Sequence, residues 1–200
     1  MTAPYFRSID STPVTTEEAL REWAEATYNV LVSIASKYGR VISPDQLAAL
    51  VQERTGVRST EPAPSWLGRV LTIVVHRCHA TDEPPLTSLV VNRSNGTVGP
   101  AYSEVQRVAG TRALNDLARE KAAAQGRLDS YRRYATDVPA NAAPVMPSTF
   151  RARRDRPVRT PRAAAPKRPV VAEIPDVPTS RICPRCYLET PIEGDCQNCG

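Results

Sequence analysis

Two closely spaced cysteine pairs near the C-terminus constrain this chain more than any other feature. Each pair encloses two residues, nine residues separate the pairs, and the four cysteines are Cys183, Cys186, Cys196 and Cys199. Two facing turns of this kind bring four thiolates together as a tetrahedron, which is the arrangement that Zn²⁺ takes in structural sites. Because protein ligands would fill all four positions, we predict a structural zinc ion with no open position for catalysis.

The segment around these cysteines, residues 180–200, is too short to bury a core, so metal binding is expected to supply most of its folding free energy. We expect residues 187–195 to form a hairpin between the pairs. Two disulfides or a redox-active pair are the alternatives, although a reducing compartment favours metal binding. The segment resembles the short zinc ribbons of nucleic-acid-associated and regulatory proteins, and the resemblance implies a protein or nucleic-acid partner.

Positive charge is concentrated in residues 151–168, which contain eight basic residues and one acidic residue, whereas residues 1–150 contain 16 and 15. Prolines recur among the basic side chains and keep such a segment extended, so its cations can follow a phosphate backbone. We predict non-specific, salt-sensitive contact with nucleic acid, the alternative being a solvated spacer. The basic residues are Arg151, Arg153, Arg154, Arg156, Arg159, Arg162, Lys167 and Arg168.

The helical patterns and most aromatic residues lie in residues 15–135, where we expect the packed core. Residues 1–14 contain two prolines and no periodic pattern, which indicates a flexible arm. Residues 136–179 are rich in Pro, Ala and Arg and cannot offset their ordering entropy by burial. We therefore predict a disordered basic linker between the helical domain and the zinc ribbon.

The starts of the first two helices have clear sequence signals. A helix begins at Thr15 or Thr16, because acidic residues follow in the favourable first turn. A second helix begins after Ser43, which is a good N-cap residue, with Pro44 at the first helical position and Gln46 completing a capping box.

A third helix, from about residue 64 to 80, has one narrow polar face. Its polar residues recur at steps of three and four and fall within a stripe of about 80°; they are Ser65, Arg69, Thr72, His76 and His79. The other positions are apolar, and Cys78 points with them as a small core residue. Since Cys78 does not converge with the two histidines, the helix does not favour a metal site.

After the third helix, the sequence predicts a β-hairpin. Residues 86–92 and 97–102 read as strands, and Asn95-Gly96 between them tolerates the positive φ angles of a tight turn. A last helical stretch covers residues 103–134, and Gly110 is expected to kink or divide it.

The order helix, short strand, helix, helix, strand, turn, strand over residues 16–102 resembles a winged helix. The resemblance implies that the third helix lies in the DNA major groove and the hairpin contacts the backbone or minor groove. The residues that would face DNA are Arg69, Thr72, His76, Arg93 and Asn95. A winged helix that binds proteins or forms a dimer is the alternative.

The layout is also similar to the winged-helix half of alkylguanine-DNA alkyltransferases. Members of that family carry a reactive cysteine just before the wing, where this chain has Pro85-Leu86-Thr87-Ser88 and no thiol. We therefore expect no alkyl transfer. No nucleophile–base arrangement, phosphate-binding glycine loop or paired carboxylates stand out, which favours a non-enzymatic protein.

The sequence contains no apolar stretch of about 18 residues or more, so we expect no membrane-spanning segment. The first ten residues lack the features of a secretory signal. The sequence thus predicts a cytoplasmic, mainly helical α+β protein: a winged-helix-like domain, a disordered linker and a small zinc ribbon. The function that we expect is DNA-binding regulation or nucleoid association, with double-stranded DNA as the partner. The alternative is an adaptor whose helical body and ribbon bind proteins, and a homodimer is left open.

Overall fold

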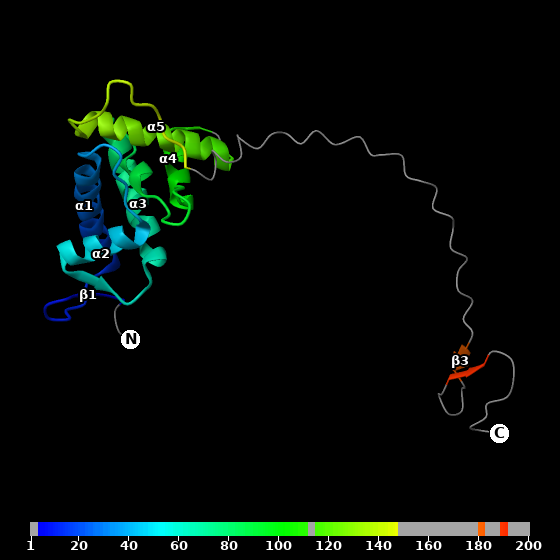
Figure 1. Cartoon of the computed structure of the whole chain (residues 1–200). Coiled ribbons are helices and arrows are strands. Elements are labelled where there is room, and N and C mark those ends of the chain that lie inside the picture. The colour runs from blue at the N-terminus through cyan, green and yellow to red at the C-terminus, as the bar shows by residue number, and fades with distance from the viewer. Residues whose placement is uncertain (1–3, 112–114, 148–179, 183–188, 192–200) are drawn as a thin grey trace. The chain divides into compact units, whose positions relative to one another are not determined.

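The structure, a computed structural model, describes residues 4–111, 115–147, 180–182 and 189–191. The chain divides into two units, Met1–Pro157 and Val158–Gly200, which are treated separately (Figure 1). The predicted zinc ligands Cys183, Cys186, Cys196 and Cys199 lie outside the described residues. So do the eight basic residues from Arg151 to Arg168.

Three helices form the centre of the first unit: α1 (Thr16–Ala35), α2 (Pro44–Thr55) and α3 (Ala63–Ala80). Helix α1 packs against both of the others, and α5 (Asp116–Tyr134) lies across the end of α1 (Figure 1). Among the described residues, no helix is both long and apolar enough to cross a lipid bilayer. The predicted mainly helical α+β class is confirmed.

Local signals set the helix boundaries where the sequence predicts them. The Thr15 hydroxyl accepts a hydrogen bond from the Glu18 backbone N–H at the start of α1. Ser43 and Gln46 form the complete capping box of α2. Helix α2 ends at Gly56, whose φ of 66° is left-handed and therefore suits glycine.

The core joins α1 to α3 through two tryptophans. Trp23 and Trp66 are both 0% exposed, and their ring centroids lie 4.2 Å apart. The Trp23 indole N–H donates to the Val57 carbonyl oxygen over 3.3 Å, and Tyr5 packs edge-on against the same ring at 5.3 Å. Aromatic burial of this size dominates the stability of a small core.

The predicted flexible arm is wrong for residues 4–14. Strand β1 (Tyr5–Arg7) pairs antiparallel with β2 (Val57–Ser59). Tyr5 is buried, and the Arg7 guanidinium forms ion pairs with two acids of α1, Glu18 and Glu22. Because β2 is distant from β1 in sequence, no local sequence pattern predicts the strand.

The two strands predicted for residues 86–102 are absent. Leu86–Leu89 (η1) and Pro100–Tyr102 (η2) are short 3₁₀ helices, and only isolated bridges join Ile42 to Val90 and Val91 to Val98. The predicted turn between them is confirmed, since the Gly96 N–H donates to the Asn92 carbonyl over 2.8 Å and Gly96 has a φ of 70°.

Next to the turn the Asn92 N–H donates to the Thr97 carbonyl over 2.8 Å, but distant residues take further hydrogen bonds that a longer hairpin would have formed. The Val91 N–H donates to the Ile42 carbonyl over 2.9 Å, and the Val98 N–H donates to the Glu120 carboxylate over 2.7 Å. Because a buried N–H needs only one partner, these contacts replace the strand ladder. The wing is thereby reduced to its turn.

The last predicted helix is divided at Gly110, as expected. Helix α4 (Ser103–Val108) precedes this glycine, which has a φ of 65°, and α5 follows with Asn115 as its N-cap.

The chain after α5 packs back on the helical domain as a segment that we call the strap, residues 136–147 (yellow in Figure 1). The Tyr38 N–H donates to the Asp137 carboxylate over 3.0 Å, and Pro147 is buried. The predicted disordered linker of residues 136–179 is therefore wrong for this part.

In the second unit, β3 (Ser180–Ile182) and β4 (Glu189–Pro191) pair antiparallel, with Ile182 opposite Glu189. The paired strands flank residues 183–188, which contain the first cysteine pair. Of the hairpin predicted for residues 187–195, the structure describes only residues 189–191, and these pair with β3.

Candidate nucleic-acid interface

Helix α3 turns its polar stripe outward, as the sequence predicts. Ser65, Arg69, His76 and His79 are exposed and Thr72 is half-buried. The opposite face fills the core; its buried residues are Trp66, Leu67, Val70, Leu71, Val74, Val75 and Cys78.

One residue of α3 departs from the predicted division between polar and apolar faces. Ile73, expected on the buried side, is 41% exposed. It lies in a groove between α1 and α3, which includes Leu20 and Ala24 of α1. The outward surface of α3 is therefore a ridge of mixed character, with an apolar residue among the polar ones.

Arg69 is the cation of this ridge that remains available to an outside partner. Within the part of the chain that the structure describes, no Asp or Glu forms an ion pair with it. Arg77, by contrast, pairs with Glu25 of α1 at 2.5 Å and stacks on the Tyr28 ring at 3.7 Å.

His76 already has a partner on the neighbouring helix α4. Its Nε2 lies 2.8 Å from the Glu104 carboxylate, which also pairs with Arg107. Hydrogen bonds from Arg107 and then from His76 lower the pKa of Glu104 to about 2, so this acid is charged at neutral pH. A negative charge beside the ridge weakens the predicted role of His76 toward DNA.

The turn of residues 92–96 presents Arg93 to solvent, and no described acid forms an ion pair with this arginine. Asn95 is exposed as predicted, but its side-chain oxygen accepts hydrogen bonds from the Thr97 N–H and hydroxyl, at 3.0 and 2.8 Å. The amide of Asn95 thus stiffens the turn that carries Arg93.

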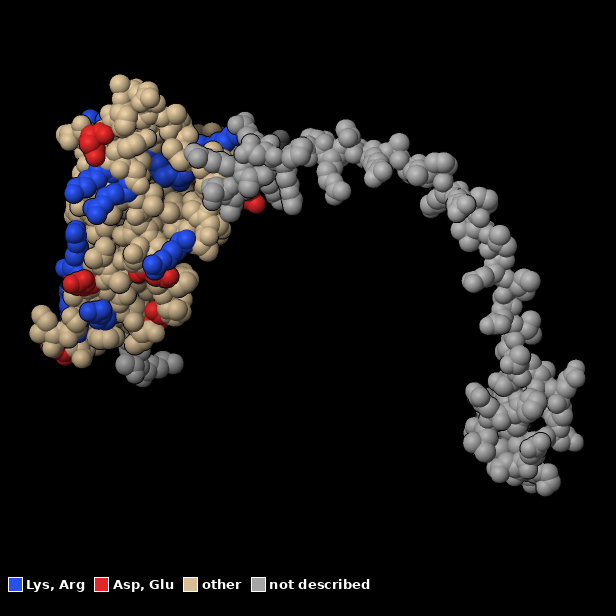
Figure 2. All heavy atoms as spheres, viewed as in Figure 1, with Lys and Arg blue, Asp and Glu red and all other residues tan. Residues whose placement is uncertain are grey.

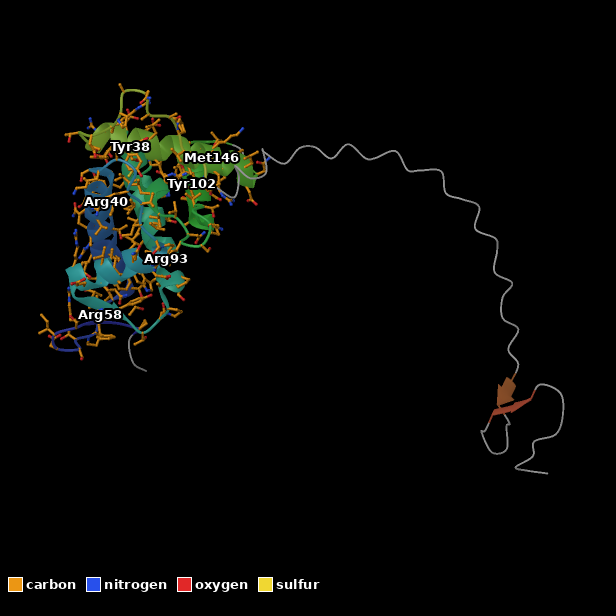
Figure 3. The ribbon with its side chains drawn as sticks, in the orientation of Figure 1. Tyr38, Arg40, Arg58, Arg93, Tyr102 and Met146 are labelled. Carbon is orange, nitrogen blue, oxygen red and sulfur yellow. The ribbon has the colours of Figure 1, made fainter. Side chains whose placement is uncertain are left out.

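A cleft of about 490 Å³ separates α3 from this turn. Gly68 of α3 lines it, with no heavy atom within 4 Å of the place where a Cβ would sit. Arg93 and Tyr102, labelled in Figure 3, also line it. The sequence offered one signal for this cleft, a glycine inside an otherwise regular helix pattern.

Both α2 and α3 begin at the cleft, but their N-termini differ in charge compensation. Helix α2 has the capping box and Asp45 in its first turn, whereas α3 has neither a side-chain cap nor an acid there. The uncompensated N-terminus of α3 therefore adds a partial positive charge beside Arg93.

Away from the ridge and the turn, the charges of the body are mixed. Figure 2 shows basic and acidic side chains interspersed over the face in view, with no broad basic area on it. The body would therefore contribute a few specific contacts to a polyanion, and bulk attraction would have to come from elsewhere in the chain.

The described part of the chain contains neither a cluster of metal ligands nor an exposed thiol. No group of three His, Cys, Asp or Glu side chains there could hold a metal ion. Cys78 is 2% exposed, and burial raises the pKa of its thiol. The predicted core role of Cys78 is confirmed.

Comparison of this chain with family models, with curated proteins and with solved structures finds no match. The resemblance to a winged helix therefore has only the order of the elements behind it, and in that order the two-stranded wing is reduced to a turn.

Proposed function

We propose that this protein is a non-enzymatic, cytoplasmic DNA-binding protein, regulatory or nucleoid-associated, with a winged-helix-like domain whose wing is a single turn. The observation that carries the proposal is the outward ridge of α3 beside an exposed turn. Arg69 and Arg93 each point to solvent without an ion pair to a described residue.

In this proposal α3 lies along the major groove of the duplex. Arg69 contacts a phosphate or makes a bidentate contact to guanine, and Arg93 contacts a phosphate of the adjacent backbone. The Thr72 hydroxyl donates to the Gly68 carbonyl over 3.1 Å, so its oxygen remains an acceptor toward a base or water. The basic residues 151–168 add salt-sensitive, non-specific affinity.

We further propose that the four C-terminal cysteines bind one structural zinc ion. Support comes from the donor set, four thiolates in two CxxC pairs, and from the antiparallel pairing of β3 with β4 on both sides of the first pair. The ion would hold this small unit together, and a protein partner would bind the unit rather than the metal.

Binding of the full chain to duplex DNA, measured at one fixed salt concentration, tests the ridge. Arg69→Ala combined with Arg93→Ala is expected to weaken binding about tenfold or more, since each charged contact contributes roughly 1 kcal/mol or more. The matched control is Arg54→Ala with Arg133→Ala, which removes the same charge from exposed positions on α2 and α5. Equal losses in the two double variants would contradict a role for the ridge.

One observation favours the adaptor as a second candidate: the exposed Ile73 in the groove of about 400 Å³ between α1 and α3. Ile73→Thr removes apolar surface without adding charge. An adaptor predicts that this variant loses a protein partner captured by the native chain, and that the native chain has no salt-dependent affinity for DNA. DNA binding predicts that the native chain has salt-dependent affinity for duplex DNA and that no protein partner depends on Ile73.

A further inference from the structure

A second cavity lies beneath the strap, on a different part of the helical domain. It has a volume of about 270 Å³ and lies between α5, the residues after α1 and the strap. Tyr38 and Met146, both labelled in Figure 3, contribute to its walls. Most of the lining is apolar, as Val91, Leu128 and Met146 illustrate.

Arg127 of α5 is the one charged side chain among the described residues that line this cavity. It is 7% exposed, and its guanidinium donates to the Ser88 carbonyl over 3.2 Å and to the Val145 carbonyl over 3.3 Å. A guanidinium has five N–H donors, so these two bonds leave donors for a further partner.

No carboxylate of the described residues forms an ion pair with Arg127. Arginine keeps its charge in proteins, and a buried charge without a paired anion is costly. The cavity therefore places a cation with an incomplete set of partners against an apolar space.

Glu120, two turns earlier on α5, compensates this charge only in part. Its side chain is 1% exposed, and one carboxylate oxygen accepts the hydrogen bond from the Val98 N–H. Burial raises the pKa of Glu120, so the carboxyl takes up a proton more readily than an exposed one. Glu120 does not line the cavity.

We propose that this cavity binds a small organic carboxylate with a compact apolar body. The carboxylate would accept hydrogen bonds from the remaining N–H donors of Arg127, because the spacing of N–H groups on the planar guanidinium matches that of two carboxylate oxygens. The body would lie against Leu128, Val91 and Met146. A phosphate ester is a poorer fit, since a dianion would need more donors than one arginine among apolar residues supplies.

The size of the cavity limits the ligand. A volume of about 270 Å³ is slightly below the usual range for drug-sized ligands, roughly 300 to 1,000 Å³. A short aliphatic or single-ring carboxylic acid is therefore the expected class. This inference does not rest on DNA binding, because none of the contacts above involves the α3 ridge or Arg93.

Calorimetric titration of the full chain with 3-phenylpropionate and with hexanoate tests the proposal. We expect saturable binding to one site and a higher melting temperature for at least one of these acids. The alcohols of the same carbon skeletons should bind at least about tenfold more weakly, since they lack the charge that pairs with Arg127. Absence of saturable binding for both acids, or equal affinity for acids and alcohols, would overturn it.

Two variants separate the site from general effects on the strap. Arg127→Met keeps an unbranched apolar stem and removes the guanidinium, and it is expected to reduce the affinity for the acid about tenfold or more. Arg132→Met is the control, because Arg132 also donates to a strap carbonyl, that of Ala142, but does not line the cavity. Native affinity in Arg127→Met, or an equal loss in Arg132→Met, would overturn the proposal.

Arg127→Met could also disturb folding, so a third variant fills the space and leaves the arginine in place. Ala143 of the strap is exposed and lines the cavity. Ala143→Phe is expected to abolish binding of the acid and to leave the melting temperature of the unliganded chain close to native. A folded Ala143→Phe variant with native affinity for the acid would contradict this location.

Discussion

Clear sequence patterns predict both the helices α1 to α3 and the strands of residues 86–102. The structure contains the helices but not the two strands. Helices α1 and α2 begin at side-chain caps formed within three residues, such as the Ser43–Gln46 capping box. Within residues 86–102, the backbone N–H groups of Val91 and Val98 donate to distant acceptors, the Ile42 carbonyl and the Glu120 carboxylate. A turn is determined by neighbouring residues, whereas a strand forms only where a second segment of the chain pairs with its N–H and C=O groups.

The largest effect should come from the core that the helices share. Trp66→Ala removes a fully buried indole that packs 4.2 Å from Trp23. We expect a loss of about 3–5 kcal/mol in the free energy of unfolding, as for other large aromatic residues in cores. Urea denaturation measures it, and a loss below about 1 kcal/mol would mean that the two tryptophans do not hold α1 to α3.

A pair of helix glycines sharpens the comparison, because only one of them packs directly against residues 85–102. A Cβ at Gly126 of α5 would lie 2.7 Å from the Pro85 ring and 3.1 Å from the Tyr102 hydroxyl. Gly126→Ala should therefore destabilise the chain by about 1–3 kcal/mol, as overpacking does.

Gly68→Ala is the matched control, since a Cβ there meets no atom within 4 Å. It should stabilise α3 by about 0.5–1 kcal/mol through helix propensity alone. Thermal or urea unfolding of both variants checks the contrast, and a gain from Gly126→Ala would mean that α5 does not pack against residues 85–102.

The capping box tests the local side of the comparison. Ser43→Ala removes the hydroxyl that accepts the Gln46 N–H at 3.3 Å, and the expected loss is about 1 kcal/mol. Ser43→Asp keeps a capping acceptor and should retain most of the native stability. The same loss in both variants, measured by urea unfolding, would show that the cap does not stabilise α2.

The smallest expected effect concerns the non-local side, at Glu120. Because burial raises the pKa of this carboxyl in the folded chain above its unfolded value, its contribution to stability is present at low pH and declines as the pH rises through the folded pKa. Glu120→Gln keeps the oxygen that accepts the Val98 N–H and has no proton to lose. The variant should gain stability relative to the native chain as the pH rises from 4 to 8.

Unfolding free energies across that pH range, with Glu53→Gln on the exposed side of α2 as the charge control, check this prediction. The opposite result would be a free energy of unfolding that rises with pH in the native chain relative to the Glu120→Gln variant. It would mean that the carboxylate is stabilised as an anion by an ion pair with Arg127.

The sequence sufficed for features whose cause lies within a few residues. The caps at Thr15 and Ser43, the outward stripe of α3 and the division at Gly110 all belong to this class. It did not suffice for β1, because the strand depends on pairing with residues 50 or more positions away. The strap was missed for the same reason, since its contacts are with Tyr38, which follows α1, and with Arg127 of α5.

The candidate site divides in the same way. Exposure of Arg69 and Arg93 followed from helix periodicity and turn chemistry. The contact between His76 and Glu104 could not be predicted, because it depends on how α4 packs against α3. The cavity around Arg127 had no counterpart in the sequence pattern, where this residue is one of several arginines in a helix.

The salt dependence of DNA affinity tests the central claim, that the α3 ridge and its neighbouring turn contact DNA. The measurement is the slope of log K against log salt concentration for the full native chain and for the variant with Arg69→Ala and Arg93→Ala. The slope should fall by about 1 if only Arg93 contacts a phosphate and Arg69 contacts guanine, and by about 2 if both contact phosphates, at roughly 0.9 per phosphate contact on duplex DNA. An unchanged slope, or affinity that does not depend on salt at all, would contradict binding through this surface.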